Sequence, residues 1–188
     1  MSRISRLMPA FAVLILAGCG NGTVIGGGGT STPAPVTVSV SFEYSIPTAN
    51  AGPAALVTGT DGYIYFTEQT ASKIGRLTTG GSFSELATTT AAAGPASIIV
   101  GPDNATWFAE SAVGKIGKVT TTFTAAAMNE YTVPWAGSTP SFLSRGVPSG
   151  SMYFTDPGAN AIGQVQTDGT FSGPFAIPTA AAGPHGIA

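Results

Sequence analysis

Residues 52–83, GPAALVTGTDGYIYFTEQTASKIGRLTTGGSF, decide the fold of this chain. Four short runs that contain β-branched and aromatic residues follow one another here, at 54–59, 63–68, 73–79 and 82–88. Asp-Gly and Gly-Gly pairs between runs supply the positive φ angles that tight turns need. Because none of these runs shows helical periodicity, we expect four short antiparallel strands.

The same pattern recurs along the chain. A second copy, GPASIIVGPDNATWFAESAVGKIGKVTTTF, occupies residues 94–123, and a looser third copy occupies residues 139–171. Phe66 and Phe108 hold the same place in the first two copies and are 42 residues apart, and Phe154 follows 46 residues later. A period of this length with four strands per copy is typical of the blades of a β-propeller.

Shorter fragments of the repeat flank these copies. Residues 38–47, VSVSFEYSIP, match an outer strand, and residues 183–188, GPHGIA, match the first strand of a fourth blade. We therefore expect an all-β fold, an incomplete propeller of three four-stranded antiparallel blades with partial strands at each end. Since an open propeller leaves sheet edges exposed, we also expect the sequence to be the N-terminal part of a longer protein.

The composition of the chain argues against some classes of binding partner and of metal site. Only 9% of the 188 residues are charged, the formal net charge is −2, and there are 26 glycines and 14 prolines. Without a basic run or stripe, nucleic acid is not expected as a partner. One cysteine excludes an intrachain disulfide framework and a cysteine-rich metal site.

The N-terminus has the pattern of a bacterial lipoprotein signal. Arg3 and Arg6 precede an apolar run at 7–18 that is too short to span a bilayer. The following LAGC at 16–19 matches a lipobox, in which the cysteine, here Cys19, becomes lipidated. The alternative is an ordinary secretory signal with an incidental cysteine.

These patterns predict three parts of the chain. Residues 1–18 are the lipoprotein signal peptide, residues 19–37 are the lipidated cysteine with a Gly/Ser/Thr/Pro-rich tether, and residues 38–188 are the partial propeller. A lipid anchor places the protein in the cell envelope, attached to the membrane. Gly20 rather than aspartate after the cysteine favours the outer membrane in a Gram-negative host.

Several stretches resemble the repeats of the virginiamycin B lyase (streptogramin lyase) family: FEYSIPTANAGPAAL (42–56), YIYFTEQTASKIGRLTTGG (63–81), YFTDPGANAIGQVQTDG (153–169) and FAIPTAAAGPHGIA (175–188). The resemblance covers roughly residues 42–188 and implies a seven-bladed ring. It also implies an enzymatic activity, an elimination that linearises a cyclic depsipeptide of the streptogramin B class. Such an activity gives antibiotic resistance. In that chemistry a histidine acts as base and Mg²⁺, held by glutamates, stabilises the developing negative charge.

His185 is the residue that the resemblance implicates. It lies in GPHGI and matches either of two family histidines, one that binds substrate and one that acts as base. Gly183 stands two residues earlier, where the catalytic copy of the motif carries glutamate, and the position of the second metal glutamate lies beyond residue 188. We therefore expect the 188-residue chain alone to lack lyase activity. The alternative for His185 is a polar residue at the rim of the channel.

Carboxylates recur at the end of the second strand of each copy: Glu68, Glu110 and Asp156. They are candidates for a ring of oxygen ligands around a cation, because hard metals prefer oxygen. The favoured interpretation is structural, since repetition at equivalent sites is what a repeated architecture demands.

Three aromatic residues, Tyr65, Trp107 and Tyr153, occupy one position of the second strand. We expect them to pack between blades, with an aromatic platform for a ligand as the alternative.

Two functions therefore stand side by side. The first is a virginiamycin B lyase-like propeller that uses Mg²⁺ and takes a small cyclic peptide. The second is a non-catalytic propeller of the cell envelope that binds a glycan, peptide or protein ligand and needs no cofactor. The lipobox favours the second, because an enzyme that inactivates an antibiotic has no evident need of an anchor.

Overall fold

A computed structural model describes residues 43–146 and 150–188. The chain divides into two units, Met1–Ser41 and Phe42–Ala188, and the described residues all belong to the second. The predicted signal peptide, Cys19 and the tether lie outside the described residues. Within the described residues, no helix is long and apolar enough to cross a membrane.

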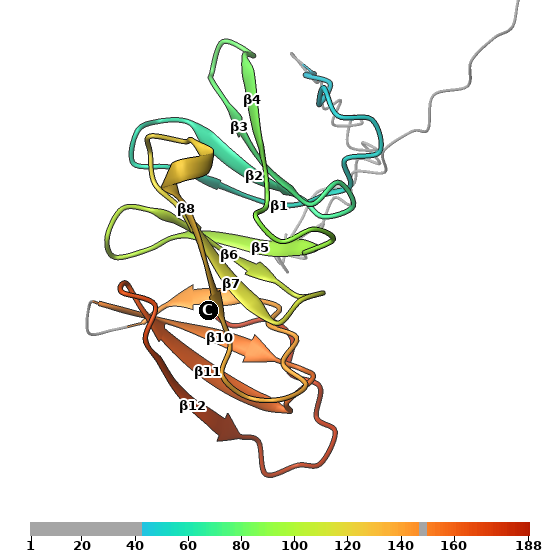
Figure 1. The fold of residues 1–188 in the computed structure, drawn as a ribbon, viewed down its shortest axis with the longest axis vertical. Coiled ribbons are helices and arrows are strands. Elements are labelled where there is room, and N and C mark those ends of the chain that lie inside the picture. Colours follow the sequence, from blue (N-terminus) through green and yellow to red (C-terminus); the bar gives the residue numbers. More distant parts are fainter. Residues whose placement is uncertain (1–42, 147–149) are drawn as a thin grey trace, which may run out of the picture. The chain divides into compact units, whose positions relative to one another are not determined.

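The described residues form three four-stranded antiparallel sheets, which confirms the predicted all-β propeller architecture (Figure 1). The first blade consists of β1 (Pro53–Thr58), β2 (Ile64–Glu68), β3 (Lys73–Leu77) and β4 (Phe83–Ala87). The second blade consists of β5 (Pro95–Val100), β6 (Thr106–Glu110), β7 (Lys115–Val119) and β8 (Met128–Thr132), with a short 3-10 helix η1 (Ala125–Ala127) before β8. The third blade consists of β9 (Leu143–Arg145), β10 (Ser151–Asp156), β11 (Ala161–Gln166) and β12 (Phe171–Ala176).

Each blade pairs its strands in sequence order and in the same register. Phe66 lies opposite Leu56 on one side and Gly75 on the other, and the second and third blades repeat this arrangement. A Cβ at Gly75 would collide with the Phe66 ring. The glycine of the repeated Ile-Gly pair therefore leaves the space that the phenylalanine ring occupies.

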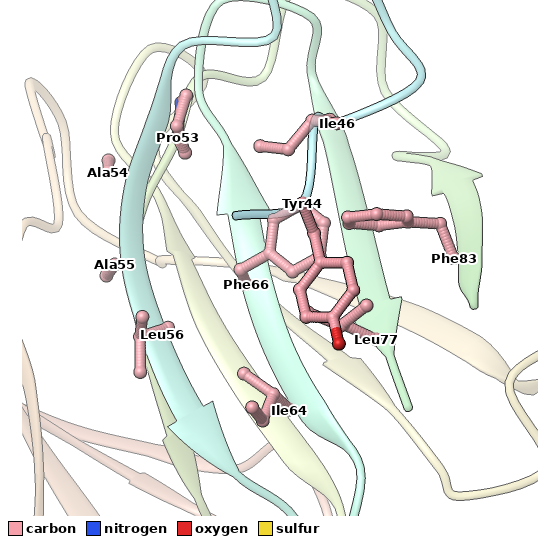
Figure 2. A pocket seen from close by; sticks show the side chains of 10 residues that line it. All are labelled: Tyr44, Ile46, Pro53, Ala54, Ala55, Leu56, Ile64, Phe66, Leu77 and Phe83. Carbon is pink, nitrogen blue, oxygen red and sulfur yellow. The ribbon is translucent and has the colours of Figure 1, made fainter. Parts of the chain in front are cut away.

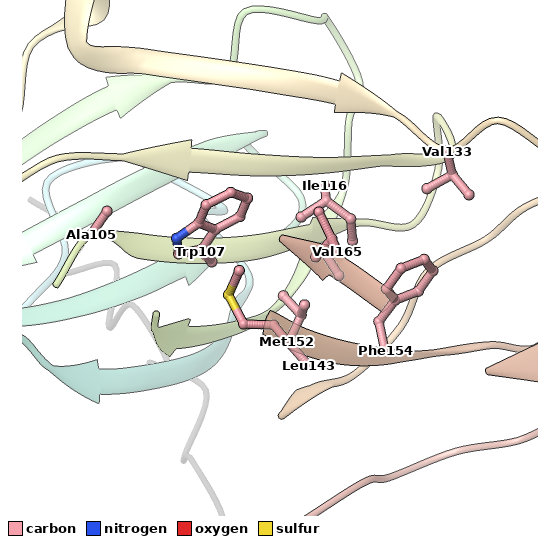
Figure 3. Packing of buried hydrophobic residues seen from close by; sticks show 9 residues of the cluster. Ala105, Trp107, Ile116, Val133, Leu143, Met152, Phe154 and Val165 are labelled. Carbon is pink, nitrogen blue, oxygen red and sulfur yellow. The ribbon is translucent and has the colours of Figure 1, made fainter. Parts of the chain in front are cut away.

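The two faces of each blade have different partners. We call forward face the side of a blade that carries Tyr65, Ile74 and Leu86 in the first blade, and backward face the side that carries Leu56, Phe66 and Leu77. The forward face of the first blade packs against the second blade's backward-face residues, which include Ile98, Phe108, Val119 and Met128. The forward face of the second blade packs against the third in the same way (Figure 3), through Trp107, Ile116, Leu143, Met152, Phe154 and Val165.

The predicted packing of the second-strand aromatics is confirmed for two blades. Tyr65 and Trp107 are fully buried between blades. Each also donates a hydrogen bond to the aspartate of its own β-turn, Tyr65 Oη to Asp61 at 2.7 Å and Trp107 Nε1 to Asp103 at 3.0 Å. This satisfies the polar end of an otherwise apolar side chain.

The predicted partial strands at the ends do not form among the described residues. Residues 43–47 and 183–188 have no strand structure, and the part of the first segment at 38–42 lies outside the described residues. A β-strand exists only through hydrogen bonds to a neighbouring strand. Neither segment has such a neighbour in the described part of the chain.

Candidate functional site

His185 lies exposed in the segment that follows β12. Its imidazole and the ring of Phe142 form a T-shaped pair, with ring centroids 6.5 Å apart and an interplanar angle of 84°. Phe142 directly precedes β9 and is itself 43% exposed. An imidazole beside an apolar ring can accept a proton or a hydrogen bond while the ring contacts an apolar group of the same ligand.

Asn160 holds the segment that leads to this histidine. Its Nδ2 donates hydrogen bonds to the carbonyl oxygens of Thr179 at 2.9 Å and Ile177 at 3.2 Å, and its Oδ1 accepts one from the amide of Gly183 at 3.3 Å. Asn160, in the loop between β10 and β11, therefore anchors the segment that carries His185, and its backbone carbonyl also accepts a hydrogen bond from the amide of Ile177 at 3.0 Å. Sequence reasoning missed Asn160, although its place in a loop next to Gly-Ala is a usual setting for such an amide.

Asp156 has a structural role. Its carboxylate is buried and accepts hydrogen bonds from Trp135 Nε1 at 2.7 Å, Ser138 Oγ at 2.6 Å, the amide of Thr139 at 2.8 Å and the amide of Ala159 at 3.2 Å. Four donors occupy the lone pairs of both oxygens. The side chain ties the link between the second and third blades to the β10–β11 turn, which is what the structural interpretation of these carboxylates describes.

Glu110 is also buried, but its environment differs from that of Asp156. Neither of its oxygens has a hydrogen-bond partner within the described residues. Burial raises the pKa of Glu110 to about 8, and the negative charge of Glu130 adds to the effect, while Lys115 opposes it. Glu110 is therefore mainly protonated at neutral pH.

Glu130 is the ionised partner in this cluster. It accepts hydrogen bonds from the amide and hydroxyl of Thr90 at 2.9 and 2.5 Å and from Lys115 Nζ at 3.3 Å. Burial alone would raise the pKa of Glu130. The hydrogen bonds from Thr90 and Lys115 outweigh burial and hold this pKa below its usual value. The ammonium of Lys115 also donates to Thr90 at 2.6 Å, which joins the second blade to the link that precedes it.

The first blade has the same cluster. Glu68 is buried, and neither of its oxygens has a hydrogen-bond partner among the residues that the structure describes. Burial is the main cause that raises the pKa of Glu68, and the negative charge of Glu85 adds to it. Glu85 accepts from Thr48 and from Lys73 Nζ at 3.1 Å. Sequence reasoning singled out Glu68 and Glu110 but missed Glu85 and Glu130, whose signal was a glutamate recurring in the outer strand of two copies.

These carboxylates do not fit a magnesium site. Glu85 and Glu130 are already paired with the ammonium groups of Lys73 and Lys115, and the lone pairs of Asp156 are occupied. Among residues 43–146 and 150–188, no three histidine, cysteine or acidic side chains are grouped as metal ligands would be.

An apolar hollow lies on the backward face of the first blade (Figure 2). It is lined by Tyr44, Ile46, Pro53, Ala54, Ala55, Leu56, Ile64, Phe66, Leu77 and Phe83. The lining holds no charged group, so the hollow suits apolar contact.

Comparison with known proteins agrees with this fold. The sequence profile described as the Virginiamycin B lyase family matches residues 35–188. No curated protein sequence matches the chain.

Solved structures give closer likenesses. A streptogramin B lyase structure is 37% identical with a TM-score of 0.72, over 78% of this chain and 47% of that one. The virginiamycin B lyase from Staphylococcus aureus is 32% identical with a TM-score of 0.72, over 77% of this chain and 48% of that one, and a catalytically inactive histidine-to-alanine variant of it was solved with quinupristin. The chain therefore spans about half the length of these solved relatives.

Proposed function

The chain belongs to the virginiamycin B lyase family, and on that premise we propose that it takes a cyclic depsipeptide of the streptogramin B class as its ligand, with His185 as the contacting group. The observation that carries the proposal is the exposed imidazole of His185, held beside the exposed ring of Phe142 by the Asn160-anchored segment. The 37% identity to a streptogramin B lyase structure supports the choice of ligand class.

In the elimination that we propose for the complete enzyme, a neutral imidazole removes a proton from the carbon next to the one that bears the ester oxygen. The electron pair of that bond forms a carbon-carbon double bond, the carbon-oxygen bond breaks, and a carboxylate leaves. No water is consumed. His185 is the group of this chain that suits the role of base, or that of hydrogen-bond partner to the substrate.

Magnesium would stabilise the enolate-like charge in this chemistry. Because the described carboxylates do not fit the ion, we assign no step of the reaction to a metal held by this chain. The proposal for Mg²⁺ concerns the complete enzyme only.

A second candidate function rests on Gly183. Where the catalytic copy of the family motif carries glutamate, this chain carries glycine, with a positive φ of 55°. That residue favours a binding protein without catalysis, anchored in the cell envelope by a lipid on Cys19, which recognises a peptide or glycan in the same place.

Isothermal titration calorimetry of the full chain with quinupristin tests the ligand class. We expect saturable binding that His185→Ala weakens about tenfold, the loss of one good hydrogen bond in a binding site. Asn129→Ala, an exposed residue of β8, is the matched control and should leave the affinity unchanged. Absence of binding by the unaltered chain, or equal affinity of the His185→Ala variant, would refute the proposal.

A further inference from the structure

The turn between the second and third strands of each blade holds the link, which is the segment that joins the outer strand of that blade to the next inner strand. Ser72, Gly114 and Asn160 occupy the same place in these three turns, with positive φ angles of 53°, 64° and 51°. The backbone carbonyl of each accepts a hydrogen bond from the first amide of its link, at 2.9, 3.0 and 3.0 Å. Because this bond recurs in the three described blades, it belongs to the repeated architecture.

The side chains at this place differ from blade to blade. The hydroxyl oxygen of Ser72 accepts one hydrogen bond, from the amide of Gly94 at 3.4 Å. Gly114 has no side chain, and a Cβ there would lie only 2.9 Å from a carbonyl oxygen of its link. Asn160 makes the most contacts, since it donates two hydrogen bonds to carbonyl oxygens of its link and accepts a third from the amide of Gly183.

The three links lead to equivalent positions of the following inner strands. Gly94 and Gly183 each stand two residues before that position, in GPAS and GPHG, and the residues there are Ala96, Ser141 and His185 in chain order. The link to the imidazole is thus held by three side-chain hydrogen bonds of its turn residue, and the links to alanine and serine by one and by none.

The position of the anchor favours a role in placing the imidazole. Only Pro184 separates the anchored amide of Gly183 from His185. The ring of a proline fixes its φ at about −65°, so little backbone freedom remains between the anchor and the histidine.

We propose that Asn160 is a positioning residue of the ligand site, which keeps the imidazole of His185 against the ring of Phe142 and thereby sets the affinity for the ligand. This inference rests on the proposed function, because it concerns the same site. An imidazole that is in place for a tenth of the time would lower the apparent affinity about tenfold.

Asn160→Gly tests the proposal, because it removes the three side-chain hydrogen bonds, keeps the backbone one, and places in this turn the residue that the second blade already has. By isothermal titration calorimetry of the full chain, we expect about tenfold weaker binding of quinupristin. Asn160→Ser, which reproduces the first blade, should fall between this variant and the parent. Ser72→Gly is the matched control, since it removes the same kind of contact from a link without the histidine, and should leave the affinity unchanged.

A double variant shows whether Asn160 acts through the histidine. In a chain that already carries His185→Ala, Asn160→Gly should cause no further loss of affinity, because the group that it positions is absent. A full further loss in that background would show a structural role only and would overturn the proposal. Unchanged affinity of the Asn160→Gly single variant would overturn it as well.

A measurement without ligand separates this inference from the proposed function. The chain contains one histidine, so the nuclear Overhauser effect between its ring and that of Phe142 reports their contact directly. We expect this effect in the parent and in Ser72→Gly, and its loss in Asn160→Gly. A parent chain that does not bind quinupristin overturns the ligand assignment, whereas an undiminished effect in Asn160→Gly overturns the role of Asn160.

Discussion

Glu110 shows how burial changes the chemistry of one residue. Its carboxyl group has no hydrogen-bond partner within the described residues, and its neighbour Glu130 has all the polar contacts that the cluster provides. One carboxyl of the pair therefore keeps a proton while the other is ionised and pairs with Lys115. The cluster is electrically balanced only as long as Glu110 remains neutral.

This residue makes stability depend on pH in a stated direction. The pKa of Glu110 is about 8 in the folded chain against 4.5 for an ordinary glutamate, so between these values the folded state binds more protons than the unfolded state. The free energy of unfolding should therefore fall as pH rises through this window, by an amount on the order of 2–4 kcal/mol. Urea unfolding at pH 5, 7 and 9 measures it.

Glu110→Gln should remove most of this pH dependence, because glutamine cannot ionise. The exposed Glu43→Gln serves as the control and should keep the full slope. An unchanged slope in the Glu110→Gln variant would contradict the account of this cluster.

At residue scale, the sequence predicted which carboxylates recur but not what surrounds them. Glu130 lies twenty residues from Glu110 and reaches it only because β8 pairs with β7. The role of Asn160 could not be predicted from the sequence either, since its contacts depend on the path that the chain takes after β12. Burial and partners of single side chains arise from tertiary packing, which the local pattern does not contain.

At the scale of the strand, the pairing of phenylalanine with glycine fixes each blade. The rings of Phe66, Phe108 and Phe154 lie over glycines of the next strand. The four strands of the first blade were predicted to within two residues at each end, because β-rich runs and turn pairs are local signals. Residues 43–47 and 183–188 are not strands as predicted, since a strand also needs a partner that no local pattern supplies.

Gly75→Ala tests this pairing. Its Cβ would strike the Phe66 ring, so we expect the free energy of unfolding to fall by about 1–3 kcal/mol, the usual effect of overpacking. Gly80→Ala is the matched control, because the nearest atom to its Cβ would be Thr78 Oγ1 at an ordinary 3.8 Å. Chemical denaturation of both variants decides the matter, and equal stability of the two would show that the ring does not need the glycine.

At the scale of the whole described unit, blades are joined by apolar faces and by one basic residue each. Arg76 of the first blade lies over the rings of Tyr63 and Phe123, at 4.4 and 4.6 Å from the ring centroids, and donates to the carbonyl of Thr121. Lys118 reaches the third blade at the carbonyl of Thr167 in the same manner. The repeat period predicted this stacking of blades, because each blade must bury both apolar faces.

The proposed function belongs to this scale as well, because the proposed ligand site combines the third blade with the segment beyond it. The chain contains a single histidine, so selective labelling with ¹³Cε1-histidine gives one imidazole resonance, that of His185. The most direct measurement is the shift of this resonance during titration with quinupristin. We predict a saturable shift at the concentrations at which calorimetry detects binding. A resonance that stays in place while quinupristin binds, or a chain that does not bind it, would contradict the account.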